Sequence, residues 1–205
     1  EKELQYIDLL YSHRVLGIVV CSHIGETMEH LDSNCPLISF EREIAENIPA
    51  VLCDNYQGGI LAANRLFDAG CRNIAIFNQP TKENIPAYSR EKAFMKCCEN
   101  KKISGRVVYT DRLAPLSEEF GNNILELLKK NSDLDGIFAT SDVMAANIIR
   151  ACKKMGKRVP EDISIVGFDD TWISTLTYPS ITTIHQPVRE MCEYAIEAIV
   201  KKVKS

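Results

Sequence analysis

The sequence lacks several motifs and segments that define common classes of protein. No stretch approaches the ~18 consecutive apolar residues of a membrane span. The charged start, Glu1-Lys2-Glu3-Leu4-Gln5, predicts that no signal peptide is present. There is no phosphate-binding loop, no Gly-x-Gly-x-x-Gly element, no Gly-x-Ser-x-Gly elbow and no His-Glu-x-x-His motif. We therefore predict that the chain is not an enzyme and holds no catalytic residue, metal or cofactor.

The sequence also has fewer basic than acidic residues. Lys and Arg together number 24 against 28 Asp and Glu, which gives a net charge of −4 and a sequence pI near 5.6. Nucleic-acid-binding domains usually carry a basic surface, so the 205 residues are not expected to bind DNA by themselves. The contents of 45% hydrophobic and 25% charged residues are ordinary for a globular domain.

Cysteine is present but shows no pattern for metal or disulfide chemistry. None of the eight cysteines forms a Cys-x-x-Cys pair. Strand-like and helical apolar segments contain or border Cys21, Cys35, Cys53, Cys152 and Cys192. We interpret the cysteines as small buried hydrophobes of a cytoplasmic protein. A redox role for the adjacent pair at 97 and 98 is the disfavoured alternative, because nothing nearby would activate a thiolate.

Short apolar runs alternate with helical periods along the whole chain. The runs lack polar alternation, as strands buried on both faces of a parallel sheet do. They are Leu16–Val20, Leu37–Phe40, Ala50–Cys53, Asn73–Phe77, Val107–Tyr109, Gly136–Ala139, Ile163–Gly167 and Ile181–Ile184. The helices between them include one entered at Ser117, one capped by Asp142 and a last one over Met191–Val203. This alternation predicts an α/β fold.

Polar residues follow most of the predicted strands. In open α/β sheets ligands bind outside the carboxyl ends of the strands, so these residues are where a site is expected. They are Cys21-Ser22-His23, Glu41-Arg42, Asp54-Asn55, Asn78-Gln79, Thr110-Asp111, Thr140-Ser141-Asp142, Asp169-Asp170 and His185-Gln186. The set is acidic and rich in amides, which suits a neutral polyol or a cation better than a phosphate. Two interpretations of Asp169-Asp170 remain, ligand binding by Asp169 or turn capping; paired catalysis is disfavoured because sequence neighbours point to different sides.

Two adjacent glycines, Gly58 and Gly59, lie within a helical period. Close packing of the helix backbone is the favoured interpretation, and contact with a ligand is the alternative.

Several fragments, in order along nearly the whole chain, resemble the effector-binding core of the LacI/GalR family of bacterial transcription regulators. They are Asp54–Gly59, Ala69–Ala75, Arg90, Gly136–Ala145, Val159–Asp170 and Pro179–Pro187. The resemblance implies the periplasmic-binding-protein-like fold, with two Rossmann-like subdomains and a ligand cleft between them. It places residues 1–52 and 188–205 in an N-terminal subdomain and residues 53–187 in a C-terminal one.

Family elements are missing from the sequence by the same comparison. The helix-turn-helix, the first core strand, the following helix and the second strand would precede Glu1, and the last strand would follow Val203. The chain is therefore expected to be part of a longer regulator, with an incomplete N-terminal subdomain. Leu16–Val20 would then be an apolar edge strand, which invites pairing with a second chain. We predict a homodimer.

The resemblance also assigns residues to the effector. Arg90 matches an arginine that bonds effector hydroxyls, and Asp169 matches an acid that accepts from them. Ser141 stands where many members place a polar contact.

Three further residues complete the predicted ligand set. Glu41 stands where members carry an acid, usually Asp, that faces the cleft. Trp172 would stack on a sugar ring or pack in a subunit interface. Gln186, at the crossover, would touch either the ligand or the hinge.

The resemblance implies that a small molecule, a sugar or a nucleobase-like compound, modulates operator binding by the missing DNA-binding domain. Some members respond instead to a protein corepressor. The competing hypothesis is a solute-binding protein of a sugar transporter, which shares the fold but would export eight scattered cysteines to an oxidising compartment.

Overall fold

The computed structural model describes residues 2–21, 35–80, 85 and 87–204. The chain forms two compact units, one of residues 1–53 and 187–205 and one of residues 54–186. It passes from one unit to the other at Cys53–Asp54 and at Gln186–Pro187. Ser22 and His23, two of the polar residues expected near a site, lie outside the described residues.

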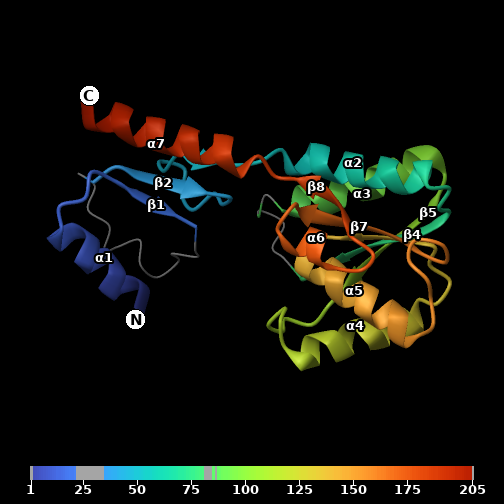
Figure 1. Cartoon of the computed structure of the whole chain (residues 1–205). Helices are drawn as coiled ribbons and strands as arrows, with labels where there is room; N and C mark the ends of the chain where they lie inside the picture. Colours follow the sequence, from blue (N-terminus) through green and yellow to red (C-terminus); the bar gives the residue numbers. More distant parts are fainter. Residues whose placement is uncertain (1, 22–34, 81–84, 86, 205) are drawn as a thin grey trace. The chain divides into compact units, whose positions relative to one another are not determined.

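The first unit has a small parallel sheet with helices on both faces (Figure 1). Its strands β1 (Ile18–Val20), β2 (Leu37–Phe40) and β3 (Ala50–Val51) pair in that order, with Ile18 opposite Leu37 and Ser39 opposite Ala50. Helix α1 (Lys2–Ser12) covers one face and α7 (Val188–Lys204) the other. Apolar contacts between α1 and the sheet involve Leu10 and Tyr11.

Helix α7 buries a narrower stripe than its sequence predicts. Met191 and Ala195 are buried, while Ile196 is 61% and Val203 47% exposed. Ile199 lies so close to β1 that a Cβ on Gly17 would come within 2.5 Å of its Cγ2. These apolar side chains of α7 stay exposed because the three short strands cover only one stripe of the helix.

The second unit is a doubly wound sheet of five parallel strands. In spatial order they are β5 (Ser104–Tyr109), β4 (Asn73–Asn78), β6 (Gly136–Ala139), β7 (Ser164–Asp169) and β8 (Thr182–His185). Helices α2 (Asn55–Asp68) and α3 (Tyr88–Lys101) cover one face, and α4 (Glu118–Lys130) and α5 (Asp142–Lys154) the other (Figure 1). A one-turn helix, α6 (Ile173–Leu176), follows β7.

Side chains of this sheet alternate between two buried layers. Phe77 and Ala75 belong to the layer that packs on α4 and α5. In the other layer, the ring centroid of Phe138 lies 5.7 Å from that of Phe94 and 6.4 Å from that of Phe168. Because both faces of the sheet are covered by helices, its strands are unbroken apolar runs in the sequence.

All eight predicted strands are confirmed, and β2 and β6 have the predicted bounds. The predicted cap of α5 is wrong. Ser141 is the N-cap, its Oγ accepting from Met144 N at 3.2 Å, and Asp142 is the first helical residue. Both residue types cap helices well, but the Asp142 carboxylate binds elsewhere, as described below.

The burial predicted for the cysteines is confirmed for Cys71, Cys98 and Cys152 and wrong for Cys21 and Cys192. Cys21 directly follows β1, and Cys192 lies one residue beyond the buried Met191 on α7, on the outward side. Burial raises the pKa of Cys98 to about 11. A thiol that resists ionisation in this way is a poor nucleophile, which disfavours the Cys97–Cys98 redox pair.

Candidate functional site

The order of the second sheet identifies one place where a ligand is expected. After β4 the chain moves outward to β5 and then returns to the other side of β4 to form β6. Ligands of open α/β sheets bind outside the carboxyl ends of the strands at such a switch point. Asn78 ends β4, and Thr140 directly follows β6. Arg90, in the first turn of α3, reaches the same place, since its Nη1 donates to Thr140 O at 3.1 Å.

Arg90 is held on several sides and is 7% exposed. Its Nε donates to Asn55 Oδ1 at 2.5 Å. The guanidinium carbon lies 3.5 Å from the centroid of the Phe168 ring, a stacked cation–π contact. We call Arg90, Asn55, Thr140 and Phe168 the Arg90 clamp. A guanidinium fixed in this way loses little conformational freedom when it binds a further acceptor.

The glycine pair of α2 lets this clamp close. A Cβ on Gly58 would lie 2.6 Å from Phe168 Cε2, and one on Gly59 would lie 2.3 Å from Arg90 O. Helix α2 therefore packs directly on the Phe168 ring and on the first turn of α3. The interpretation of Gly58-Gly59 as a close-packing pair is confirmed.

A buried carboxylate stands next to the buried arginine. Glu91 Oε2 accepts from Asn78 Nδ2 at 3.0 Å, and Oε1 accepts from Tyr109 OH at 2.7 Å. Thr140 Oγ1 donates to Asn78 Oδ1 at 3.2 Å, which joins this chain of bonds to the Arg90 clamp. The bond to Glu91 raises the pKa of Tyr109 to about 12. Glu91 is as buried as Arg90, so the first turn of α3 carries one buried residue of each sign.

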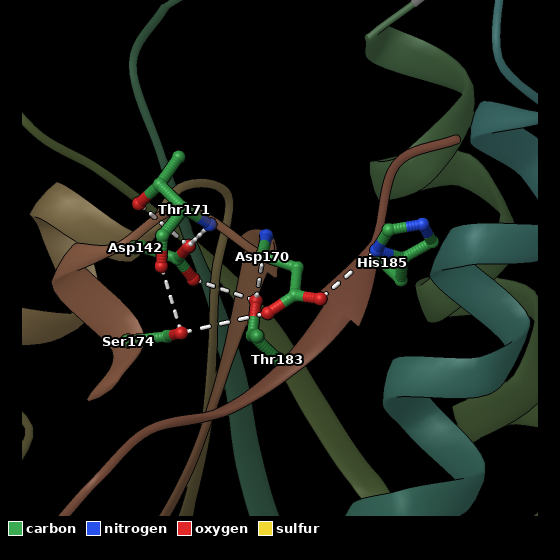
Figure 2. A network of polar contacts seen from close by, with 6 residues as sticks. All are labelled: Asp142, Asp170, Thr171, Ser174, Thr183 and His185. Atoms are coloured by element: carbon green, nitrogen blue, oxygen red, sulfur yellow. Dashed lines mark hydrogen bonds and ion pairs between the residues drawn. The ribbon is translucent and has the colours of Figure 1, made fainter. Parts of the chain in front are cut away.

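The predicted acid Asp169 ends β7 in an unusual backbone conformation. Its φ is 102°, and that of Asp170 is 57°. Figure 2 shows the side chains around the second residue of this turn. Asp170 Oδ2 lies 2.9 Å from His185 Nδ1, and Asp170 Oδ1 accepts from Ser174 Oγ at 3.5 Å. The Asp170 carboxylate thus contacts Ser174 and His185. A contact of Asp169 with a ligand stays a prediction.

Asp142 supports the same turn from α5 (Figure 2). Its Oδ2 accepts from Thr171 N at 2.6 Å and from Thr171 Oγ1 at 3.0 Å. Its Oδ1 accepts from Thr183 Oγ1 at 2.6 Å. We call residues 169–171 the Asp169 turn. Residues 140–142 therefore contact both parts of the candidate site, Thr140 at the Arg90 clamp and Asp142 at the Asp169 turn.

The other predicted ligand residues lie in different settings. Ser141 stands between Thr140 and Asp142, its oxygen engaged in the helix cap. Trp172 follows the Asp169 turn and is 71% exposed. Gln186 is the last residue of the second unit. Their contact with a ligand stays a prediction.

Glu41 belongs to the first unit and follows β2 with a φ of 57°. Its Oε1 accepts from Cys53 N at 2.7 Å, and its Oε2 lies 3.6 Å from Cys53 Sγ. The carboxylate thus holds the segment that leads out of the first unit. A contact of Glu41 with a ligand stays a prediction too.

Two parts of the site were not predicted from the sequence. Glu91 was overlooked because a glutamate in a polar helix usually faces solvent; its position next to Arg90 was the available signal. The stacking role of Phe168 was overlooked because an aromatic residue in a buried strand is usually core.

The candidate site combines a fixed guanidinium from α3 with the carboxylate of Asp169 at the end of β7. Within the described residues, no group of three or more His, Cys, Asp or Glu side chains is placed to hold a metal ion. Across the same part of the chain, no helix combines the length and apolar character needed to cross a membrane. A polyhydroxylated ligand matches this chemistry, because each hydroxyl both donates and accepts.

Comparisons with known proteins agree with this fold. Residues 63–205 match the family described as periplasmic binding protein-like domain. A ribose operon repressor from Halalkalibacterium halodurans is 32% identical over the whole chain, which covers 60% of that protein. A sucrose operon repressor from Lactococcus lactis is 29% identical over 99% of the chain and 62% of its own length. The chain spans about three fifths of the length of these curated relatives.

Solved structures give the same result. A periplasmic binding protein/LacI transcriptional regulator from Alkaliphilus metalliredigens, in complex with D-xylulofuranose, has a TM-score of 0.82 and 32% identity. The alignment covers 99% of this chain and 75% of that one. A LacI-family regulator from Enterococcus faecium with bound ribose has a TM-score of 0.81 at 24% identity. The alignment covers 98% of this chain and 76% of that one, and it supports the fold alone. The chain belongs to the periplasmic binding protein-like domain family and, within it, to the LacI type of transcriptional regulator.

Proposed function

We propose that this chain is the effector-sensing part of a LacI-type regulator and that its effector is a small sugar, with pentoses the first candidates. The observation that carries the proposal is a fixed guanidinium at the switch point of the second sheet, with an acid at the end of the next strand. Arg90 is buried and held by Asn55 and Thr140 O, and Asp169 lies at the end of the neighbouring strand β7. The ribose operon repressor and the D-xylulofuranose complex among the relatives support the choice of pentoses.

The same residues bear on the mechanism. Each sugar hydroxyl that bonds Arg90 or Asp169 replaces water with a charged partner in a fixed position, which discriminates well between ligands. A ligand that binds one orientation of two units more tightly than another shifts the population toward that orientation. In an intact regulator this shift would change the affinity for operator DNA, reciprocally and by about 1–3 kcal/mol.

The partners follow from the same proposal. Operator DNA would bind through a helix-turn-helix outside this chain, in the cytoplasm. We also propose a homodimer, since β1 is an edge strand of the described first sheet, with Val19 41% exposed. A transporter solute-binding protein is the weaker alternative, because the likeness to LacI-type regulators extends over the whole chain.

A thermal-unfolding screen tests the proposal. Wild-type chain is heated with D-ribose, D-xylulose, sucrose, cellobiose, adenine or guanine. A bound sugar at about 100 times its Kd adds about 2.7 kcal/mol and raises Tm by roughly 5–11 °C. Arg90→Ala should abolish the shift. Arg158→Ala is the matched control, since Arg158 is an exposed arginine paired with Asp162. A shift from purines alone, or an unchanged Tm in every sugar, would contradict the proposal.

A further inference from the structure

The Asp169 turn is the most strained stretch of backbone in the described second unit. Two consecutive non-glycine residues, Asp169 and Asp170, have positive φ. Such a conformation costs roughly 1–2 kcal/mol for each L-residue. It persists only where the surrounding contacts determine it, and such residues cluster at functional sites.

Asp142 supplies the contacts. Both its oxygens are used, Oδ2 by the amide and hydroxyl of Thr171 and Oδ1 by the hydroxyl of Thr183. Thr183 lies on β8, and its Oγ1 is also 3.4 Å from the Asp170 amide. The Asp142 carboxylate thus links Thr171, which follows the strained pair, to Thr183 on β8. Figure 2 shows Asp142, Thr171 and Thr183 converging in this way.

The surroundings of Asp142 are shaped for this contact. Asp142 is fully buried, and as the first residue of α5 its charge meets the positive end of the helix dipole. Ser141 performs the capping, so the Asp142 carboxylate is not used for that purpose. The neighbouring strand β7 carries Gly167, where a Cβ would lie 2.5 Å from Asp142 Oδ1. Any side chain at 167 would displace the carboxylate.

We infer that Asp142 is a positioning residue of the sugar site, acting through Thr171 and Thr183 to fix the backbone that presents Asp169. The inference rests on the proposed function. Asp142 itself would not contact the sugar, because both its oxygens bind Thr171 and Thr183. Loss of its bonds to Thr171 and Thr183 should release the turn to an ordinary conformation, move the Asp169 carboxylate and weaken sugar binding. The fold of the second unit should survive, because the core of the sheet is apolar and separate.

Two variants separate positioning from a general loss of stability. Thr183→Val keeps the shape of the side chain and removes the hydroxyl that donates to Asp142. Thr183→Ser keeps that hydroxyl and is the rescue control. Affinity for D-ribose and D-xylulose is measured by calorimetry at 15 °C, well below unfolding. We expect Thr183→Val to weaken binding about tenfold, as loss of a hydrogen bond to a buried charge does. Thr183→Ser should bind within about twofold of wild type, because the bond remains.

Asp142→Asn gives a second readout that does not need sugar. Hydrogen exchange of the Thr171 amide should be slow in wild type, because the amide donates to a buried carboxylate, and faster in the variant. Asp133→Asn, at an exposed aspartate paired with Arg106, is the matched control and should change neither exchange nor affinity.

The outcomes are distinguishable. If wild type binds a pentose but Thr183→Val and Asp142→Asn bind it equally well, the positioning role is overturned and the proposed function stands. If wild type binds none of the sugars, the proposed function falls and the positioning role falls with it. An equal loss of sugar affinity in Thr183→Val and Thr183→Ser would also overturn the positioning role, because the hydroxyl would then not be the group that sustains binding.

Discussion

The Arg90 clamp and the Asp169 turn prepare the same proposed site by different means. Arg90 sits in an ordinary helix, with the Phe168 ring under its guanidinium and helix α2 packed against its backbone, and its hydrogen bonds to Asn55 and Thr140 add to this packing. Asp169 sits in a strained turn that is fixed by hydrogen bonds to a buried carboxylate. The comparison shows that a long cation can be held by the shape of its surroundings. A short acid, by contrast, has its position set by the backbone.

The two parts should therefore respond differently to mutation. Damage to packing around Arg90 should cost stability first and binding as a consequence. Damage to the Asp169 turn should weaken binding first, with a smaller loss of stability.

Phe168→Ala removes the ring beneath Arg90. Phe168 is 1% exposed and contacts Phe138 as well, so the variant leaves a cavity in the core. We expect the free energy of unfolding to fall by about 3–5 kcal/mol, measured by urea denaturation. Phe168→Leu should lose less, since it fills part of the space. A loss below about 1 kcal/mol for Phe168→Ala would show that packing does not hold the clamp.

Gly59→Ala tests the backbone contact of the same region. The added Cβ would meet the Arg90 carbonyl oxygen, which cannot move without shifting α3. We expect a loss of about 1–3 kcal/mol in the free energy of unfolding. Gly121→Ala is the control, because the only close neighbour of its Cβ would be the far end of the flexible Arg150 side chain, at 2.7 Å, with Asn147 Oδ1 in ordinary contact at 3.5 Å. Equal effects at the two positions would contradict close packing at Gly59.

Asp169→Gly tests the strain in the turn. Glycine adopts positive φ without steric cost, which offsets its greater freedom in the unfolded chain. We expect Asp169→Gly to be more stable than Asp169→Ala by up to about 1 kcal/mol, because both variants lose the carboxylate and only glycine relieves the positive φ. Sugar binding should be lost in both. At Glu161, an exposed residue of a turn without positive φ, glycine should be no more stable than alanine. An Asp169→Gly variant that is no more stable than Asp169→Ala in chemical denaturation would argue against stored strain.

Tyr109 provides a pH-dependent probe of the chain of bonds behind Arg90. Its hydrogen bond to Glu91 raises its pKa from 10 to about 12. The unfolded tyrosine therefore loses its proton first as the pH rises. The stabilisation is complete below pH 10 and is lost as the pH approaches 12. In urea unfolding, the stability advantage of wild type over Tyr109→Phe should shrink between pH 10 and pH 12. An advantage that grows with pH would contradict the hydrogen bond from Tyr109 to Glu91.

Much of the fold was predictable because its signals are local. Strands such as Leu37–Phe40 and Gly136–Ala139 are short apolar runs between polar residues, and the structure gives them the same bounds. The helix start at Ser141-Asp142 was assigned to the wrong residue, because both side chains cap well and only the distant Thr171 and Thr183 decide between them. Helices α1 and α6 were not predicted, since neither has a strong apolar period.

The candidate site was predictable in part. Arg90 and Asp169 were selected on their resemblance to a family. In the structure Asp169 ends β7, and Arg90 reaches from α3 to Thr140, which follows the neighbouring strand β6. Their supports were not predictable, because Glu91, Phe168 and Asp142 act through contacts with residues 13 to 78 positions away in the chain. Local sequence carries no record of such contacts.

A crystal structure of the chain grown with D-ribose or D-xylulose would show whether Arg90 and Asp169 bind the sugar together. We expect sugar hydroxyls within hydrogen-bond distance of both the Arg90 guanidinium and the Asp169 carboxylate, with the Asp142–Thr171 bonds intact. A sugar bound elsewhere on the chain, or one that touches neither residue, would contradict this expectation.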